Sequence, residues 1–119
     1  VTAVGAEERS AVGVQLANTL RGAVSQVLLP TVGGKARALA YEVMVGSPAV
    51  RSNIREGNLP GLNLAIQSGA GAGMIAMDSR LRELYEGARI SYDTAISYAR
   101  DPNMILDRGG TRRAPAGVR

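Results

Sequence analysis

A pair of arginines four residues apart is the feature of this sequence with the clearest chemical potential. Residues 46–57 read Gly-Ser-Pro-Ala-Val-Arg-Ser-Asn-Ile-Arg-Glu-Gly, which places Arg51 and Arg55 on one face of any helix formed there. Two unpaired like charges at this spacing cost a helix roughly 0.2–0.5 kcal/mol. Guanidinium groups are well shaped to bind carboxylates and phosphates. The pair is therefore either a solvated helix face or a site that faces an anionic partner.

The residues around the pair predict a short helix with defined ends. Ser47 is a preferred N-cap residue, and Pro48 suits the first helical position, where no backbone donor is needed. Gly57 is a typical C-terminal stop. Val50 and Ile54 share an apolar face beside the arginines, so one side of this helix can be buried.

Two glycine-rich segments only partly match known anion-binding loops. A phosphate loop that ends in Gly34-Lys35 needs Gly at position 29 and Ser or Thr at position 36, and the sequence has Leu29 and Ala36. A plain hairpin turn is the favoured interpretation there. Residues 69–73 alternate Gly and Ala before a helix, but no strand leads into them. We therefore predict a hinge or a close-packing turn at this second segment.

The composition excludes several kinds of site. The 119 residues contain no Cys and no His, which removes disulfides, thiol nucleophiles, zinc sites and the usual neutral-pH acid–base residue. The ten Asp and Glu show no clustered ligand spacing, so we predict no metal site in this chain. The net charge is +4, but Arg108, Arg112, Arg113 and Arg119 lie at the C-terminal end. This location weakens the case for a nucleic-acid surface.

Apolar periodicity and turn residues predict a first half that mixes helix with strand and a second half that is helical. We expect a basic, disordered tail from about residue 108. The predicted strands form a hairpin that belongs to the edge of a larger sheet, because an isolated hairpin is marginally stable in water. The predicted helices span residues 6–20, 48–56, 60–67, 74–86 and 91–99, and the strands span 23–29 and 36–45.

The strand over 36–45 predicts a buried or edge-exposed acid. Residues 38, 40, 42 and 44 share one face of this strand, and Leu39, Tyr41 and Val43 share the other. Glu42 is then either an exposed edge residue or a buried partner for Arg51 or Arg55, and the second interpretation is slightly favoured.

The predicted helices each carry an apolar stripe. In the helix over 6–20, Val12, Leu16 and Leu20 recur at i, i+4 and i+8, with Gly13 and Ala17 beside them. The helix over 74–86 is predicted to bury one stripe and to expose the i,i+4 charge pairs Asp78–Arg82 and Arg82–Glu86 on its wet side. Its stripe consists of Met74, Met77, Leu81, Leu84 and Tyr85.

The arginine segment resembles the Ala-Ile-Arg-Asn-Leu-Ile-Arg-Glu motif of the type IV pilus retraction ATPases, the PilT family. In this chain the motif reads Ala-Val-Arg-Ser-Asn-Ile-Arg-Glu over residues 49–56, so five of eight positions are identical and Val50 is conservative. Ser52 and Asn53 depart from the pattern. Further short matches follow in the family's order over roughly residues 6–105. They include residues 14–17, 24–30, 40–44, 65–69, 73–78 and 87–102.

The resemblance implies an α/β fold, namely the C-terminal part of a RecA-like ATPase domain followed by a helical subdomain. The expected division is residues 1–46 for the end of the ATPase core, 47–107 for the helical subdomain and 108–119 for the tail. The chain begins with Val1, so we expect the natural start to lie further upstream. In the family the ATP and magnesium sites and the catalytic carboxylates also lie upstream of the matched segment, so the resemblance implies no catalytic or cofactor-binding residue in this chain.

The resemblance also implies a role, a partner and a location. The parent is expected to be a hexameric homo-oligomer, peripheral to the inner face of the cytoplasmic membrane, that hydrolyses ATP to retract pili and acts on an inner-membrane pilus platform protein. The motif residues carried over as retraction or partner-coupling candidates are Ala49, Arg51, Ile54, Arg55 and Glu56. The fragment alone is not expected to hydrolyse ATP or to bind nucleic acid.

Three alternatives stay open at the level of sequence. One is a type II secretion or pilus-assembly ATPase, whose C-terminal domain looks similar. Another is a stand-alone adaptor that docks onto such a motor. The third is a small basic protein that binds nucleic acid through the arginines of residues 108–119.

Overall fold

The computed structural model describes residues 5–107 of the chain, except for the side chain of Ala6. Helices and strands alternate in the first half, and helices alone follow, as the sequence predicts. Short 3₁₀ turns lie at Ala70–Ala72 and Pro102–Met104. The main elements are α1 (Ala6–Thr19), β1 (Gly22–Pro30), β2 (Arg37–Val45), α2 (Pro48–Glu56), α3 (Leu59–Gln67), α4 (Met77–Glu86) and α5 (Tyr92–Tyr98).

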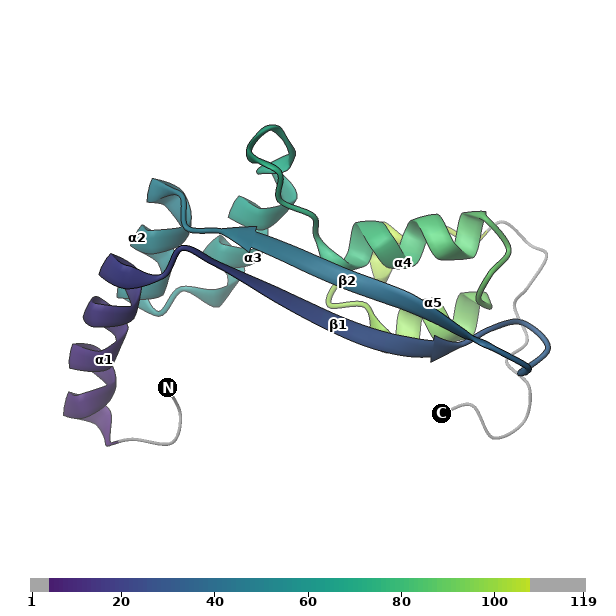
Figure 1. The fold of residues 1–119 in the computed structure, drawn as a ribbon, viewed down its shortest axis with the longest axis horizontal. Helices are drawn as coiled ribbons and strands as arrows, with labels where there is room; N and C mark the ends of the chain where they lie inside the picture. Colours follow the sequence, from purple (N-terminus) through teal and green to yellow (C-terminus); the bar gives the residue numbers. More distant parts are fainter. Residues whose placement is uncertain (1–4, 108–119) are drawn as a thin grey trace. The chain divides into compact units, whose positions relative to one another are not determined.

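Strands β1 and β2 pair as a two-stranded sheet, and Figure 1 shows them as one long hairpin. The loop between the strands is closed where the Thr31 backbone N–H donates to the Ala36 carbonyl at 3.1 Å. Gly33 and Gly34 adopt positive φ in this loop, so the glycine pair makes a hairpin turn. The fold class is the predicted mixture of helices and strands.

The chain folds into two compact units that interleave along the sequence. Of the described residues, the first unit combines 5–24 with Val43–Ile75, and the second combines Ser25–Glu42 with 76–107. The hairpin strands therefore contribute residues to both units. The expected division at residues 46 and 107 concerns the parent domain and stays a prediction, and the predicted tail over 108–119 lies outside the described residues.

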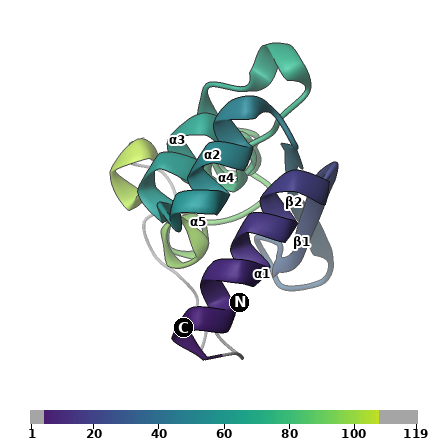
Figure 2. The same ribbon diagram turned by 90° about the vertical axis from the view of Figure 1, so that its left-hand side faces the viewer.

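In the first unit, α1 packs on α2 and α2 packs on α3, as Figure 2 shows from that end of the chain. Ala17 and Val50 are fully buried there, and Gly13 is buried beside them. A methyl group at Gly13 would lie 3.7 Å from the Ile54 carbonyl oxygen, so small residues on α1 let the backbone of α2 approach closely. The prediction that α1 buries a Val12 stripe is wrong, because Val12 is 40% exposed.

In the second unit, one face of the hairpin packs against α4 and α5. Ala38, Ala40 and Glu42 are buried on that face, whereas Leu39 is exposed on the other, so the predicted alternation along β2 is confirmed. The core is aliphatic apart from Tyr85. The ring of Tyr85 meets the ring of the partly buried Tyr92 edge to face, at a centroid distance of 5.5 Å. The buried apolar residues of this core are Leu29, Ala38, Ala40, Leu81, Leu84, Tyr85, Ile90, Ala95 and Ile105.

Helix α4 begins three residues later than the sequence predicts. Ile75 forms an isolated antiparallel bridge with Val43, so this stretch of chain is extended and not helical. Met74 is buried, but it does not belong to the apolar stripe of α4. The prediction was wrong because apolar spacing alone cannot distinguish a helical turn from an extended segment in which one residue, Ile75, pairs with a distant strand.

Candidate functional site

Helix α2, which carries the arginine pair, has the predicted ends. The Ser47 side chain accepts a hydrogen bond from the Val50 backbone N–H at 3.3 Å, and Pro48 occupies the first helical position. Gly57 ends the helix in the left-handed conformation, with φ of 68°. Because these caps are local, the sequence sets the position and length of this helix. It also sets which residues of the motif share a face.

The structure places the five motif candidates along α2 at different depths. Ala49, Arg55 and Glu56 are exposed, whereas Arg51 and Ile54 are half-buried. The fully buried residue of the helix is Val50, which faces the interior of the first unit. The candidates therefore lie on one short helix, but they do not form a closed pocket.

Arg51 is bound to the backbone at the start of its own helix. Its Nε–H donates to the Gly46 carbonyl at 3.0 Å, in a partly buried position. The Gly46 backbone N–H in turn donates to the Arg21 carbonyl at 2.8 Å. Arg51 thus links α2 to the end of β2, and through Gly46 to the connection between α1 and β1.

Arg55 contacts a different element. Its Nη2 donates to the Asn18 side-chain Oδ1 on α1, at 3.3 Å and in an exposed position. This distance is long for a hydrogen bond of a charged donor. Asn18 is a neutral acceptor, so the charge of Arg55 has no counter-ion among residues 5–107. Of the two arginines, Arg55 is the one available to an external anion.

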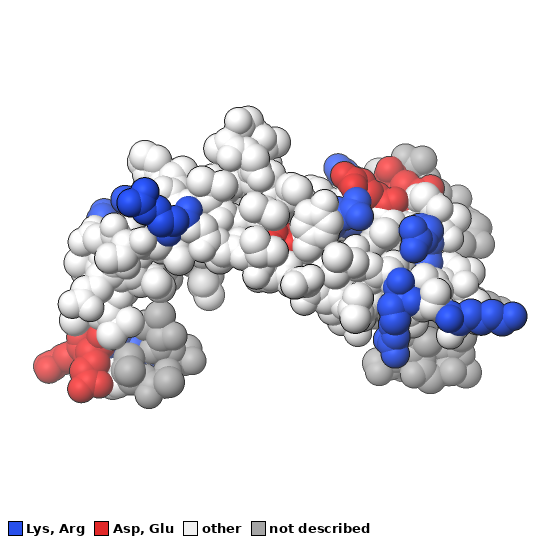
Figure 3. Space-filling view, in the orientation of Figure 1, with Lys and Arg blue, Asp and Glu red and all other residues white. Residues whose placement is uncertain are grey.

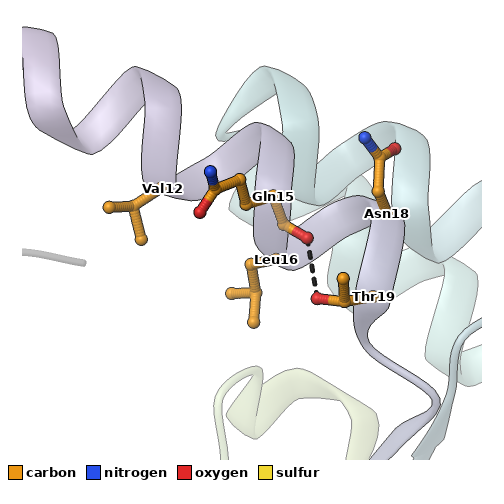
Figure 4. Close-up of a pocket in the computed structure, with 5 residues that line it drawn as sticks. All are labelled: Val12, Gln15, Leu16, Asn18 and Thr19. Carbon is orange, nitrogen blue, oxygen red and sulfur yellow. Dashed lines mark hydrogen bonds between the residues drawn. The ribbon is translucent and has the colours of Figure 1, made fainter.

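An open hollow lies beside α1, next to the acceptor of Arg55. Its volume is about 560 Å³, and Figure 4 shows Val12 and Leu16 projecting from the same side of the helix. Gln15, Asn18 and Thr19 supply polar groups around it. Asn18 therefore belongs both to this hollow and to the contact with Arg55.

Charges are separated along the first unit. On the face shown in Figure 3, acidic side chains gather at the start of α1, where Glu7 and Glu8 lie in the first turn. Basic side chains gather near the other end of that helix, where it meets α2 and the hairpin. An anionic partner would be attracted to this second end.

The other candidate loops serve as turns. The segment before α4 forms a 3₁₀ turn, and a methyl group at Gly69 would lie 2.7 Å from the Met74 sulfur, so this glycine permits close packing. Within the described part of the chain, no three acidic side chains are grouped closely enough to hold a metal ion.

Comparison with known proteins finds relatives that match most of this chain. The type IV pilus retraction ATPase PilT of Pseudomonas aeruginosa is 37% identical to this chain over 97 residues, which cover 82% of the chain and 28% of that protein. A twitching motility protein of Neisseria gonorrhoeae is 34% identical over 100 residues, which cover 84% of the chain and 27% of that protein. A crystal structure of the pilus retraction motor PilT with bound ADP superposes with a TM-score of 0.62, at 32% identity, over 85% of this chain and 27% of that one.

Over the segment that these comparisons cover, the chain belongs to the PilT family. It spans slightly more than a quarter of the length of the PilT-family relatives that it matches. The Legionella pneumophila ATPase DotB is 24% identical over 79% of this chain and 25% of that one, with a TM-score of 0.53, which shows a shared fold. No protein-family model matches the sequence. Within residues 5–107, no helix combines the length and apolar character needed to cross a bilayer.

Asn53, which departs from the PilT-family motif, contacts the next helix. Its Nδ2 donates to the Ala49 carbonyl at 2.8 Å, and its Oδ1 lies where a methyl group on Gly61 would stand. The Asn58 side chain caps α3 by accepting from the Gly61 backbone N–H at 3.1 Å. Gly61 therefore lets α3 approach this polar residue of the motif.

Gly61→Ala is expected to lower the free energy of unfolding by about 1 kcal/mol, the size of a lost N-cap. The added methyl would overlap Asn53 Oδ1 and would lie 2.6 Å from Asn58 Nδ2, displacing the cap. In an Asn53→Ala background the same substitution should cost less, because only the contact with Asn58 Nδ2 remains. A double-mutant cycle in urea measures this difference. A stabilising effect of Gly61→Ala alone would contradict the packing described.

Glu42 has a different partner from the one that the sequence favours. It is buried as predicted, with 6% of its surface exposed, but its Oε2 and Oε1 accept from Arg100 Nη1 at 2.7 Å and Nη2 at 3.0 Å. The same Oε2 also accepts from the Met77 backbone N–H at 3.1 Å and so caps α4. The prediction of a pair with Arg51 or Arg55 is wrong, because the buried face of β2 points toward α4 and α5.

Asp78 is a second buried acid, and its predicted position on the exposed side of α4 is wrong. It was predicted on the wet side of α4, but only 4% of its surface is exposed. Its two carboxylate oxygens accept from the backbone N–H groups of Arg100 and Asp101, both at 2.9 Å. Together, Glu42 and Asp78 hold the chain that follows α5. A signal for Glu42 was available, because a carboxylate on the same strand face as two alanines needs a cation when buried.

Proposed function

We propose that this chain is the C-terminal portion of an ATPase motor that retracts type IV pili, and that α2 couples the motor to its partners. The support is the capped helix with Arg51 and Arg55, together with 37% identity to a pilus retraction ATPase over most of the chain. In this proposal the parent assembles as a hexamer. It works in the cytoplasm, against the inner face of the cytoplasmic membrane, and acts on an inner-membrane platform protein of the pilus.

In the proposed parent, ATP and magnesium bind upstream of the segment represented here. The support is indirect: the solved PilT motor contains ADP, and this chain covers 27% of it. The role of this chain is then mechanical. Its first unit transmits nucleotide-driven movement through α2 and does not touch the nucleotide, and it does not bind nucleic acid.

Replacing both Arg51 and Arg55 with alanine in the complete motor is expected to abolish pilus retraction and to leave ATP binding nearly unchanged. The reason is that neither guanidinium belongs to a nucleotide site in this proposal. Retraction is measured as twitching motility of a piliated strain that carries the variant, and ATP binding is measured by calorimetry on the purified motor. The matched control is Arg82→Ala, which removes an exposed arginine from α4.

Loss of ATP binding in the double variant would count against a coupling role. It would indicate that the two arginines contribute to the nucleotide site instead. Normal twitching with both arginines absent would count against the motif altogether. Twitching should stay normal in the Arg82→Ala control, because that residue lies outside α2.

A further inference from the structure

We infer that the two arginines of α2 have separate roles: Arg51 positions the helix, and Arg55 is the residue that contacts a carboxylate on the partner. This inference rests on the proposed function, since it divides the coupling role between two residues. It begins from the difference in their hydrogen bonds, because one guanidinium is bound to buried backbone and the other to an exposed side-chain amide.

Arg51 meets the requirements of a positioning residue. It is half-buried, and its Nε bonds to the Gly46 carbonyl, one residue before the N-cap of α2. A hydrogen bond from a charged donor to partly buried backbone contributes more to stability than an exposed one. This bond fixes the angle at which α2 leaves β2, so removal of the side chain loosens the helix and not only its surface.

Arg55 meets the requirements of a contact residue. It is exposed near the C-terminal end of α2, and its guanidinium bonds to Asn18 at 3.3 Å. A neutral amide at that distance orients a guanidinium without neutralising its charge. Side-chain donors of the guanidinium fork remain for a second acceptor, and a carboxylate matches that fork in two-point geometry.

The neighbouring surface indicates the kind of partner. The hollow beside α1 is lined by the exposed Val12 and the half-buried Leu16, and Figure 4 shows the Asn18 side chain projecting from another side of the helix. A partner segment that presents an Asp or Glu beside Asn18 would pair with Arg55. Its carboxylate would meet a cation that has no internal counter-ion among the described residues.

Asn18 supplies a sharp test, because Asn18→Asp places a carboxylate at the atom that Arg55 already contacts. The internal ion pair should occupy Arg55 and so block the partner's acid. We expect this variant to keep the melting temperature of the chain and to abolish retraction in the complete motor. The control Asn103→Asp adds the same charge at an exposed position outside α1 and α2, and it should keep retraction.

Two measurements distinguish the roles of Arg51 and Arg55. One is the stability of the 119-residue chain, and the other is twitching motility with the complete motor. Arg51→Ala should lower the melting temperature by about 5 °C, and Arg55→Gln by less than about 2 °C. In the motor, Arg55→Gln should abolish retraction at every temperature. Arg51→Ala should regain retraction on cooling, because its defect is one of helix position.

Several results would overturn the inference. One is a melting temperature that falls as far with Arg55→Gln as with Arg51→Ala. The others are retraction that persists in the Arg55→Gln motor and retraction that persists in the Asn18→Asp motor. The proposed function has its own test, since deletion of the whole motor gene must abolish retraction. If the deletion leaves retraction intact, the proposed function is wrong, and so is the proposed role of Arg55 in contacting a partner. The melting temperatures still test whether Arg51 positions the helix.

Discussion

Gly46→Ala is expected to destabilise the chain by about 3 kcal/mol, the upper end of the usual cost of overpacking. The added methyl would overlap the Leu20 carbonyl oxygen and would lie 3.2 Å from the Arg21 carbonyl oxygen. Both obstacles are backbone, so no side-chain rotation can relieve them. Space, and not a positive φ, requires glycine at this position.

Urea unfolding followed by circular dichroism measures this effect. Gly71→Ala is the matched control, because nothing lies within 4 Å of its added methyl and its φ is not positive. The control should change the free energy of unfolding by less than about 0.5 kcal/mol. Equal effects of the two substitutions would mean that α1 and the end of β2 do not approach each other as described.

Arg100→Met is expected to lower the free energy of unfolding by about 3 kcal/mol, although the Arg100 side chain is 48% exposed. The reason lies with its partner, since the substitution leaves the Glu42 carboxylate buried with the Met77 backbone N–H as its described donor. A buried charge without a cation is costly. Methionine keeps an apolar stem, so lost packing contributes little to the expected change.

The same reasoning predicts a partial rescue. Glu42→Gln in the Arg100→Met background should recover part of the lost stability, because a neutral amide is cheaper to bury than a carboxylate. The surface pair Arg80–Glu83 is the control: its Glu83 side chain is 61% exposed, and Glu83→Gln should cost less than about 1 kcal/mol. A cost for Glu83→Gln as large as that for Arg100→Met would contradict the difference between buried and exposed pairs.

The accuracy of the sequence predictions followed the range of the interactions involved. The ends of α2 depend on Ser47, Pro48 and Gly57, all within or next to the helix, and they were predicted correctly. The cap of α5 is equally local: Ser91 accepts from the Thr94 backbone N–H at 3.1 Å. Side-chain caps and backbone stops act over three or four residues, so a sequence pattern contains the information needed.

The failures all concern contacts between distant residues. Residue 42 meets residue 100 across 58 positions, and the start of α4 was displaced because Ile75 pairs with Val43. Helix α1 has two neighbouring faces that could be buried, one with Val12 and one with Gly13 and Ala17. The close approach of α2 buries the face with Gly13 and Ala17. Apolar periodicity identifies the helix and strand faces that can be buried. It does not identify the element that packs on a face or the distance between the two backbones.

For the candidate site, the sequence by itself indicated the relation to the PilT family, because several short matches in order are specific. It also determined that the two arginines share a face of one capped helix, since side-chain spacing on a helix is fixed by its 3.6-residue turn. Only the tertiary structure decided that Arg51 binds the backbone of Gly46 while Arg55 reaches Asn18. Two identical side chains acquire different partners because their burial and neighbours are set by how α1, β2 and α2 pack, and that packing depends on residues far apart in the chain.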